Sequence, residues 1–235
     1  MVLPPARKRE LLGDLPLFAG LSPAELDALA AVTRSRSLEA RQELFHKGDA
    51  GKEVYAVVAG TLKVLTTSEQ GDDVVFDLLG PGDVFSEIAM LCNEPRSASV
   101  VALSECELLV IERRELLAFL RSHPNAALEL MAVLAERVRN LSQLVEDTLF
   151  LNLPVRLAKK LVAYASSHGR LTPEGVRIEL KLSQEEWGDL VGATRESVNK
   201  QLRVWSEQGL IRVDHGYVVL RRAKALEALA GALIV

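Results

Sequence analysis

The hydrophobic pattern of this chain changes once, at about residue 113, and this change constrains the fold more than any other feature. From about 37 to 112, β-branched and apolar runs such as EVYAVVAGTLKVL and DDVVFDLLG alternate with Gly/Asp clusters such as KGDAG and GPGD. Several short strands broken regularly by turns predict an all-β barrel or jelly roll. From 113 to about 150 no Gly occurs and Pro124 is the only proline, so this segment predicts helix.

Apolar residues in the helical segment recur at a spacing of 3-4-3-4-3, which is the a/d pattern of a coiled coil. They are Met131, Leu134, Val138, Leu141 and Val145, continued by Thr148. A helix packed on the core of its own domain is the alternative. Charged residues such as Glu136 and Arg139 flank the stripe. The pattern favours a two-chain coiled coil, and we predict that the first five residues form a homodimer interface.

Pro154 interrupts the helix and suits the first turn of a new one, which places a hinge at 150–154. The charge balance changes at the same point. Residues 1–153 hold 15 Lys and Arg against 23 Asp and Glu, whereas residues 154–235 hold 13 against 9. A basic C-terminal part suggests a polyanionic partner; an accidental imbalance is the alternative.

The segment LSQEEWGDLVGATRESVNKQLRVWSEQGLI has the layout of a helix-turn-helix unit. Ser183 and Glu186 form a capping box for the first helix. Gly192 ends that helix, and Thr194 is a suitable N-cap for a second helix that Gly209 closes. The strand pair LIRVDHGYVVL, which follows directly, predicts a β-hairpin wing.

The second helix of this unit has an inward apolar face, which contains Val198, Leu202 and Trp205, and an outward polar face. Arg can pair with guanine, Glu can accept from cytosine, and Lys can reach guanine or phosphate. A solvated surface is the alternative. We predict DNA contacts from the outward residues Arg195, Glu196, Ser197, Asn199, Lys200 and Arg203. Ser183, Gln184 and Thr194, at helix N-termini, are placed to reach phosphate oxygens.

The stretch GDVFSEIAMLCNEPRSASV, residues 82–100, places polar residues in a predicted loop between two strand-like runs. Arg96 offers a charge-assisted fork to a phosphate, and Ser97 lies beside it. The carboxylate of Glu87 can accept from a sugar hydroxyl. A simple ion pair between Glu87 and Arg96 is the alternative. We predict a pocket for a phosphate and its sugar, as a cyclic nucleotide would supply.

FSEIAMLCNEPRSASV resembles the phosphate-binding cassette of cyclic-nucleotide-binding domains, whose pattern is close to F-G-E-[LI]-A-L-L…P-R-[SA]-A. With ATRESVNKQL in the helix-turn-helix, nearly the whole chain resembles the bacterial cyclic AMP receptor protein (CRP/FNR) family of transcription regulators. The resemblance implies that Glu87 binds the ribose hydroxyl, that Arg96 and Ser97 bind the phosphate, and that Arg137 pairs with Glu87. It extends the ligand site to Phe85, Ser86, Ile88, Leu141 and Ser142, and implies base reading by Arg195, Glu196 and Lys200 at half-sites like TGTGA.

The chain departs from the family pattern at three positions. Ser86 stands where the cassette usually has Gly. Leu141 stands where cyclic-AMP-specific members have a Thr that bonds the adenine amino group, although Ser142 keeps the next polar position. Leu141 also fits the seam as dimer core, so the base preference stays open. Lys200 replaces the usual Arg, which weakens bidentate reading of guanine.

We therefore expect an α+β chain of three parts. These are a β jelly-roll cyclic-nucleotide-binding domain at 1–123, a dimerisation helix with its hinge at 124–152, and a winged helix-turn-helix domain at 153–235. The expected function is a homodimeric transcription regulator that responds to cyclic AMP, binds an inverted repeat in double-stranded DNA and contacts RNA polymerase. The alternatives are constitutive action, a response to cyclic GMP or a cyclic dinucleotide, and a regulatory module of a kinase or channel.

Other classes of protein find little support. No uncharged apolar run approaches the roughly 18 residues of a membrane span, and none follows the N-terminal basic cluster as in a signal peptide. Cys92 and Cys106 lack CxxC spacing, which argues against a disulfide framework or a metal site. We find no nucleophile–base pairing or Walker loop and expect no enzymatic activity. We expect a cytoplasmic protein without a metal.

Overall fold

The computed structural model describes residues 3–18, 20–71 and 73–231, and the chain divides into two compact units, Met1–Arg139 and Asn140–Val235. The division falls inside the longest helix, α5 (Pro124–Phe150), so each unit contains part of this helix. The limits expected at 123 and 152 stay predictions. No helix in the described part of the chain is long and apolar enough to cross a membrane.

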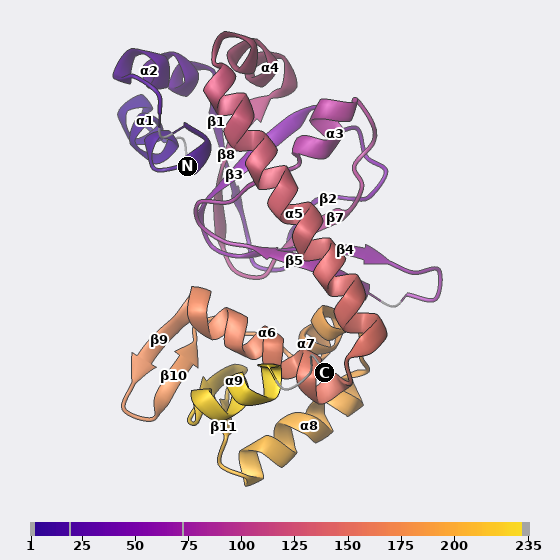
Figure 1. The fold of residues 1–235 in the computed structure, drawn as a ribbon. Coiled ribbons are helices and arrows are strands. Elements are labelled where there is room, and N and C mark those ends of the chain that lie inside the picture. The colour runs from indigo at the N-terminus through magenta and orange to yellow at the C-terminus, as the bar shows by residue number, and fades with distance from the viewer. Residues whose placement is uncertain (1–2, 19, 72, 232–235) are drawn as a thin grey trace. The chain divides into compact units, whose positions relative to one another are not determined.

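Two four-stranded antiparallel sheets form the centre of the N-terminal unit (Figure 1). Their strand orders are β1-β8-β3-β6 and β2-β7-β4-β5. The first and last strands of the unit, β1 and β8, pair along their length. Strand β2 pairs with β7, with a shift in register between Glu43 and Phe45. This closure confirms the predicted jelly roll. The strands are β1 (Arg34–Leu38), β2 (Glu43–Phe45), β3 (Glu53–Ala59), β4 (Leu62–Thr67), β5 (Asp73–Leu79), β6 (Val84–Phe85), β7 (Ser99–Ala102) and β8 (Cys106–Glu112).

Strand β3 divides the apolar residues of this unit between two cores, because successive side chains point to opposite faces of a strand. Tyr55 and Val57 belong to the cluster between the sheets, together with Phe85 of β6. Val54 and Ala56 belong to a second cluster on the other face. The alternation thus gives the sheet two buried faces, one toward the other sheet and one toward the helices.

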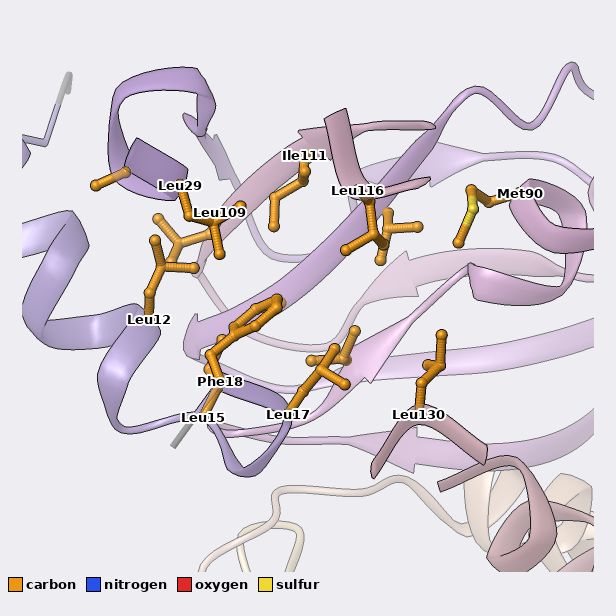
Figure 2. Close-up of a cluster of buried hydrophobic side chains, with 14 of the residues drawn as sticks. Leu12, Leu15, Leu17, Phe18, Leu29, Met90, Leu109, Ile111, Leu116 and Leu130 are labelled. Carbon is orange, nitrogen blue, oxygen red and sulfur yellow. The ribbon is translucent and has the colours of Figure 1, made fainter. Parts of the chain in front are cut away.

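Helices cover the second cluster, as Figure 2 shows. Leu12 and Phe18 from the N-terminal segment meet Leu109 of β8 there, and Met90 and Leu130 also belong to the cluster. One apolar core therefore anchors the short helix that carries Met90 and the beginning of α5. The helices are α1 (Pro5–Gly13), η1 (Pro16–Phe18), α2 (Pro23–Val32), α3 (Glu87–Cys92) and α4 (Arg113–Ser122).

The C-terminal unit contains a four-stranded antiparallel sheet of order β11-β12-β10-β9. The β11–β12 turn has positive φ at His215 (49°) and Gly216 (89°), as a two-residue hairpin turn requires. The predicted wing is thus confirmed. The elements are α6 (Leu153–His168), β9 (Gly169–Thr172), β10 (Gly175–Ile178), α7 (Gln184–Val191), α8 (Arg195–Glu207), β11 (Ile211–Asp214), β12 (Tyr217–Leu220) and α9 (Ala223–Gly231).

Candidate ligand and DNA-binding sites

The stretch 82–100 is not a plain loop between strands, and that expectation was wrong. After β6 the chain turns at Ser86, whose φ of 75° and ψ of 14° are left-handed, and then forms the six-residue helix α3. Asn93, also left-handed, ends this helix. The short helix buries Ala89 and Met90 in the core and leaves Ile88 exposed. The two buried apolar residues, Ala89 and Met90, therefore anchor this polar-looking segment in the core.

Glu87, at the start of α3, is fully buried. Its Oε1 accepts a hydrogen bond from Nη1 of Arg137 on α5, while Nη2 of Arg137 donates to the carbonyl of Val84 at 2.6 Å. The pairing of Arg137 with Glu87, which the family resemblance implied, is thus confirmed. Among the ion pairs of the described residues, Glu87 is joined to Arg137 and not to Arg96. Glu87 and Arg96 therefore do not neutralise each other by direct contact.

Arg96 is 5% exposed, which is unusual for an arginine. Its backbone N–H donates to the carbonyl of Asp49 at 2.8 Å, and its Nη1 donates to the carbonyl of Glu53 at 2.9 Å. The guanidinium carbon lies 4.2 Å from the centre of the Phe45 ring. Burial lowers the pKa of Arg96 from its usual value, which reflects the cost of removing this cation from water. A buried cation of this kind is well prepared for an anionic partner.

Three polar atoms of this segment are buried without a hydrogen-bond partner in the described part of the chain. They are Ser86 Oγ, Glu87 Oε2 and Arg96 Nε. A buried polar atom without a partner lowers the stability of the folded chain by about 1–3 kcal/mol. Three such atoms within residues 86–96 are therefore costly unless a ligand pairs with them. The set offers one anionic acceptor, one cationic donor and one hydroxyl. This complement fits a sugar hydroxyl and a phosphate.

The remaining predicted ligand residues have varied surroundings. Phe85 is buried and stacks on Tyr55, and Ser97 is exposed directly after Arg96. Leu141 and Ser142 are exposed on α5 and belong to the C-terminal unit. Their place in the ligand site stays a prediction.

The helix-turn-helix is formed by α7 and α8, as predicted. Ser183 Oγ accepts from the N–H of Glu186 at 3.1 Å, and the N–H of Ser183 donates back to the Glu186 carboxylate at 2.7 Å. Thr194 caps α8 through a bond from the N–H of Ser197, at 3.3 Å. Gly188 is required because a Cβ there would lie 2.5 Å from the carbonyl oxygen of Ala193. These contacts fix the turn between the two helices.

The two faces of α8 separate as the sequence indicates. Val198, Leu202 and Trp205 are buried, at 0%, 2% and 3% exposure. The outward residues Arg195, Glu196, Ser197, Asn199, Lys200 and Arg203 are all exposed, as are Ser183 and Thr194, while Gln184 is half-buried. Arg203 forms an exposed ion pair with Glu207 on the same helix. The exposed row is available to a partner, and its role in DNA binding stays a prediction.

Comparison with known proteins gives both halves of the chain a family. Residues 35–123 match the model of the cyclic nucleotide-binding domain, and residues 155–229 match the Crp-like helix-turn-helix domain. The cyclic AMP receptor protein of Thermus thermophilus is 35% identical over 216 residues, which are 92% of this chain and 96% of the relative. The chain belongs to the CRP family of transcription regulators. Its domains are thus a cyclic-nucleotide-binding domain and a winged helix-turn-helix domain.

A second relative and a solved structure are also similar to this chain. The "CRP-like cAMP-activated global transcriptional regulator" of Mycobacterium tuberculosis is 28% identical over 217 residues, which cover 92% of this chain and 97% of that one. Among solved structures, the c-di-GMP responsive global regulator CLP of Xanthomonas campestris superimposes with a TM-score of 0.75. At 20% identity it covers 85% of this chain and 99% of its own, and it shows the shared fold.

The seam residues of α5 are exposed in the single chain. Met131, Val138 and Val145 have exposed fractions of 55%, 64% and 58%, and Leu134 is half-buried. The alternative in which this stripe packs on the core of its own domain therefore does not apply to the exposed members. An apolar stripe of this kind is typical of a helix that pairs with another chain.

Arg156 of α6 is a contact residue that sequence reasoning missed. Its Nε donates to the carbonyl of Val191 at 2.8 Å, its Nη2 to the carbonyl of Gly192 at 3.2 Å, and its Nη1 to the carbonyl of Leu151 at 2.7 Å. The guanidinium therefore ties the segment before α6 to the end of α7, where a positive charge also suits the helix dipole. All its partners are backbone carbonyls, and two of them lie 35 and 36 residues away in the sequence, so no motif pointed to them.

The left-handed backbone at Ser86 yields a prediction about stability. A side chain in this region costs roughly 1 kcal/mol, so Ser86→Gly should stabilise the chain by about that amount and raise Tm by about 2–4 °C. A thermal melt without nucleotide measures the effect. Ser37→Gly, at an exposed position of strand β1, is the control and should lower Tm, since Gly weakens a strand. A Tm for Ser86→Gly below that of the wild type would contradict the claim that the backbone at Ser86 is strained.

Proposed function

We propose that this CRP-family regulator is a homodimer whose binding to an inverted repeat in DNA is controlled by a cyclic nucleotide, with cyclic AMP as the first choice. The observation that carries the proposal is the group of unpartnered buried atoms around α3. In the proposed complex the Arg96 guanidinium and Ser97 bind the cyclic phosphate. Glu87 Oε2 accepts from the ribose 2′-hydroxyl, and Ser86 and its neighbours Phe85 and Ile88 shape the site.

Glu87 provides the proposed connection between the ligand and α5. One carboxylate oxygen already accepts from Arg137, and the other is free to accept from the ligand. A ligand hydroxyl that donates to Oε2 would restrict the movement of the Glu87 carboxylate. Because Glu87 pairs with Arg137, this restriction would favour one arrangement of α5. The same helix carries the seam residues, so occupancy of the pocket would shift the dimer between two populations.

The proposed DNA contacts follow from the exposed row of α8. Arg195, Glu196 and Lys200 would read base edges in the major groove, while Ser183, Gln184 and Thr194 would hold phosphates. Two copies of α8 in a symmetric dimer would occupy half-sites about 34 Å apart, one turn of DNA. RNA polymerase is a further proposed partner, as the family resemblance implies.

Fluorescence anisotropy tests this function directly. A labelled inverted repeat of TGTGA half-sites is titrated with the protein alone and with cyclic AMP, cyclic GMP or cyclic di-GMP, at fixed salt because salt changes such affinities strongly. We expect cyclic AMP to increase the affinity for this operator and not for a scrambled duplex. Equal binding to both duplexes under all conditions would overturn the proposed function.

The open preference for a base leaves a second candidate effector besides cyclic AMP. Leu141 offers no hydrogen bond to an adenine amino group, and a solved relative of similar fold is described as responsive to c-di-GMP. A response to cyclic GMP or cyclic di-GMP alone would keep the regulator and change its effector. Tight operator binding that no nucleotide alters would indicate a constitutive regulator.

Arg195→Ala should weaken binding to the operator by about 1–3 kcal/mol, because a bidentate contact to a base edge is lost. Binding to a scrambled duplex should change little. Lys224→Ala, which removes one exposed charge from α9, serves as the control and should leave both affinities close to the wild-type values. Equal losses on both duplexes would show that Arg195 contacts phosphate only.

A further inference from the structure

The guanidinium of Arg96 has two different edges, and only one is occupied by the protein. Nη1 donates to the carbonyl of Glu53, whereas Nε is buried and has no hydrogen-bond partner among the described residues. A guanidinium can offer a carboxylate or phosphate the edge that contains Nε. The hydrogen bond at Nη1 does not by itself fix the plane of the guanidinium, because the arginine side chain can adopt several rotamers. Another contact must therefore determine which way the Nε edge points.

The ring of Phe45, at the end of β2, supplies a contact of the required kind. The guanidinium carbon of Arg96 lies over this ring at 4.2 Å from its centre, and 5.5 Å from the centre of the Tyr55 ring. The Phe45 and Tyr55 rings are themselves 5.8 Å apart. A cation over an aromatic face is attracted by the ring and prefers a fixed plane, most strongly where water is excluded.

Backbone hydrogen bonds hold the segment after Phe45 next to Arg96. The N–H of Gly48 donates to the carbonyl of Arg96 at 2.9 Å, and the N–H of Arg96 donates to the carbonyl of Asp49 at 2.8 Å. The chain that follows Phe45 is thus bonded directly to residue 96. The Tyr55 hydroxyl donates to the Glu53 carboxylate at 2.6 Å. The backbone carbonyl of the same residue, Glu53, accepts from Arg96 Nη1. Burial and this carboxylate raise the pKa of Tyr55 to about 12, so its hydroxyl stays protonated.

We propose that Phe45 is a positioning residue of the ligand site, whose ring holds the Arg96 guanidinium so that its Nε edge faces the anionic group of the ligand. The inference rests on the proposed function, because it assumes that this anion belongs to a cyclic nucleotide. Phe45 acts through Arg96, and its effect is confined to the part of the affinity that comes from the phosphate. The half-buried ring is otherwise an ordinary member of the apolar cluster between the sheets.

Isothermal titration of the full-length protein with cyclic AMP and cyclic GMP tests the proposal. Phe45→Leu keeps an apolar side chain and removes the ring, and we expect about tenfold weaker binding of the nucleotide that the wild type binds. Phe45→Tyr keeps the ring and should bind within about twofold of wild type. Phe76→Leu is the matched control, a half-buried Phe of β5 in the same unit, and should also bind like wild type.

A purely structural role of Phe45 predicts a different result in a double-mutant cycle. If the ring acts through Arg96, then Phe45→Leu should change the remaining affinity by less than about twofold once Arg96→Gln is present. A further tenfold loss in that background, or unchanged binding by Phe45→Leu alone, would overturn the positioning role. A wild-type protein that binds no cyclic nucleotide would overturn the proposed function itself, and the inference with it.

Discussion

Arg96→Gln is expected to weaken cyclic nucleotide binding by at least about 100-fold and to abolish the nucleotide-dependent increase in operator affinity. Hydrogen bonds to a charged group contribute about 1.5–3 kcal/mol each, and two such bonds between Arg96 and a phosphate would be lost together. A 100-fold loss corresponds to about 2.7 kcal/mol. Isothermal titration measures the first effect and fluorescence anisotropy the second.

Two further variants separate this effect from a loss of folding or of net charge. Arg96→Lys keeps the charge but has no Nε edge, and it should still lose most of the affinity because an ammonium binds as a point charge. Arg9→Gln removes one exposed charge from α1 and should behave like wild type. Thermal melts without ligand should show Arg96→Gln to be folded. Full nucleotide response by folded Arg96→Gln would contradict the assignment of the pocket.

Part of the phosphate-binding cassette could be predicted from the sequence, and part could not. Glu87 and Arg96 were identifiable because their residue types suit a phosphate and its sugar, and the family resemblance named Arg137 as the partner of Glu87. The helix α3 was not predicted, since six residues are too few for a periodic pattern and Ser86 is not the residue expected in a left-handed turn. Phe45 escaped notice for a different reason. Its contact with Arg96 joins positions far apart in the chain, which no local pattern records.

The same distinction applies to the fold. Turn clusters and strand-length apolar runs identified the jelly roll, and caps identified α7 and α8, because both depend on neighbours in sequence. The end of α5 at Phe150 also agrees with the sequence prediction. The boundary between the two compact units depends instead on contacts between different helices. Asp147 of α5 accepts from Lys159 of α6 at 2.6 Å, and Leu151 accepts from Arg156. These contacts bind the last turns of α5 to the C-terminal unit, which begins at Asn140, whereas Pro154 is the visible break in the sequence.

Val138→Glu should convert the proposed homodimer into a monomer and reduce operator affinity by at least about 100-fold. Val138 is an a position of the seam and is 64% exposed in the single chain, so the new carboxylate costs little there. In a parallel two-chain coiled coil the two copies would face each other, which places like charges and no apolar contact at the centre of the interface. A monomer would also engage only one half-site, which removes the gain from simultaneous binding.

Sedimentation equilibrium measures the oligomeric state of this variant, and anisotropy on the full operator and on a single half-site measures its DNA binding. Asn140→Glu places the same charge on an exposed position of α5 that is neither an a nor a d position of the seam, and it should remain dimeric with wild-type affinity. A monomeric Val138→Glu that keeps its half-site affinity would separate dimerisation from base reading. If Val138→Glu stays dimeric and binds the operator like wild type, the two chains meet through another surface and the seam is not the interface.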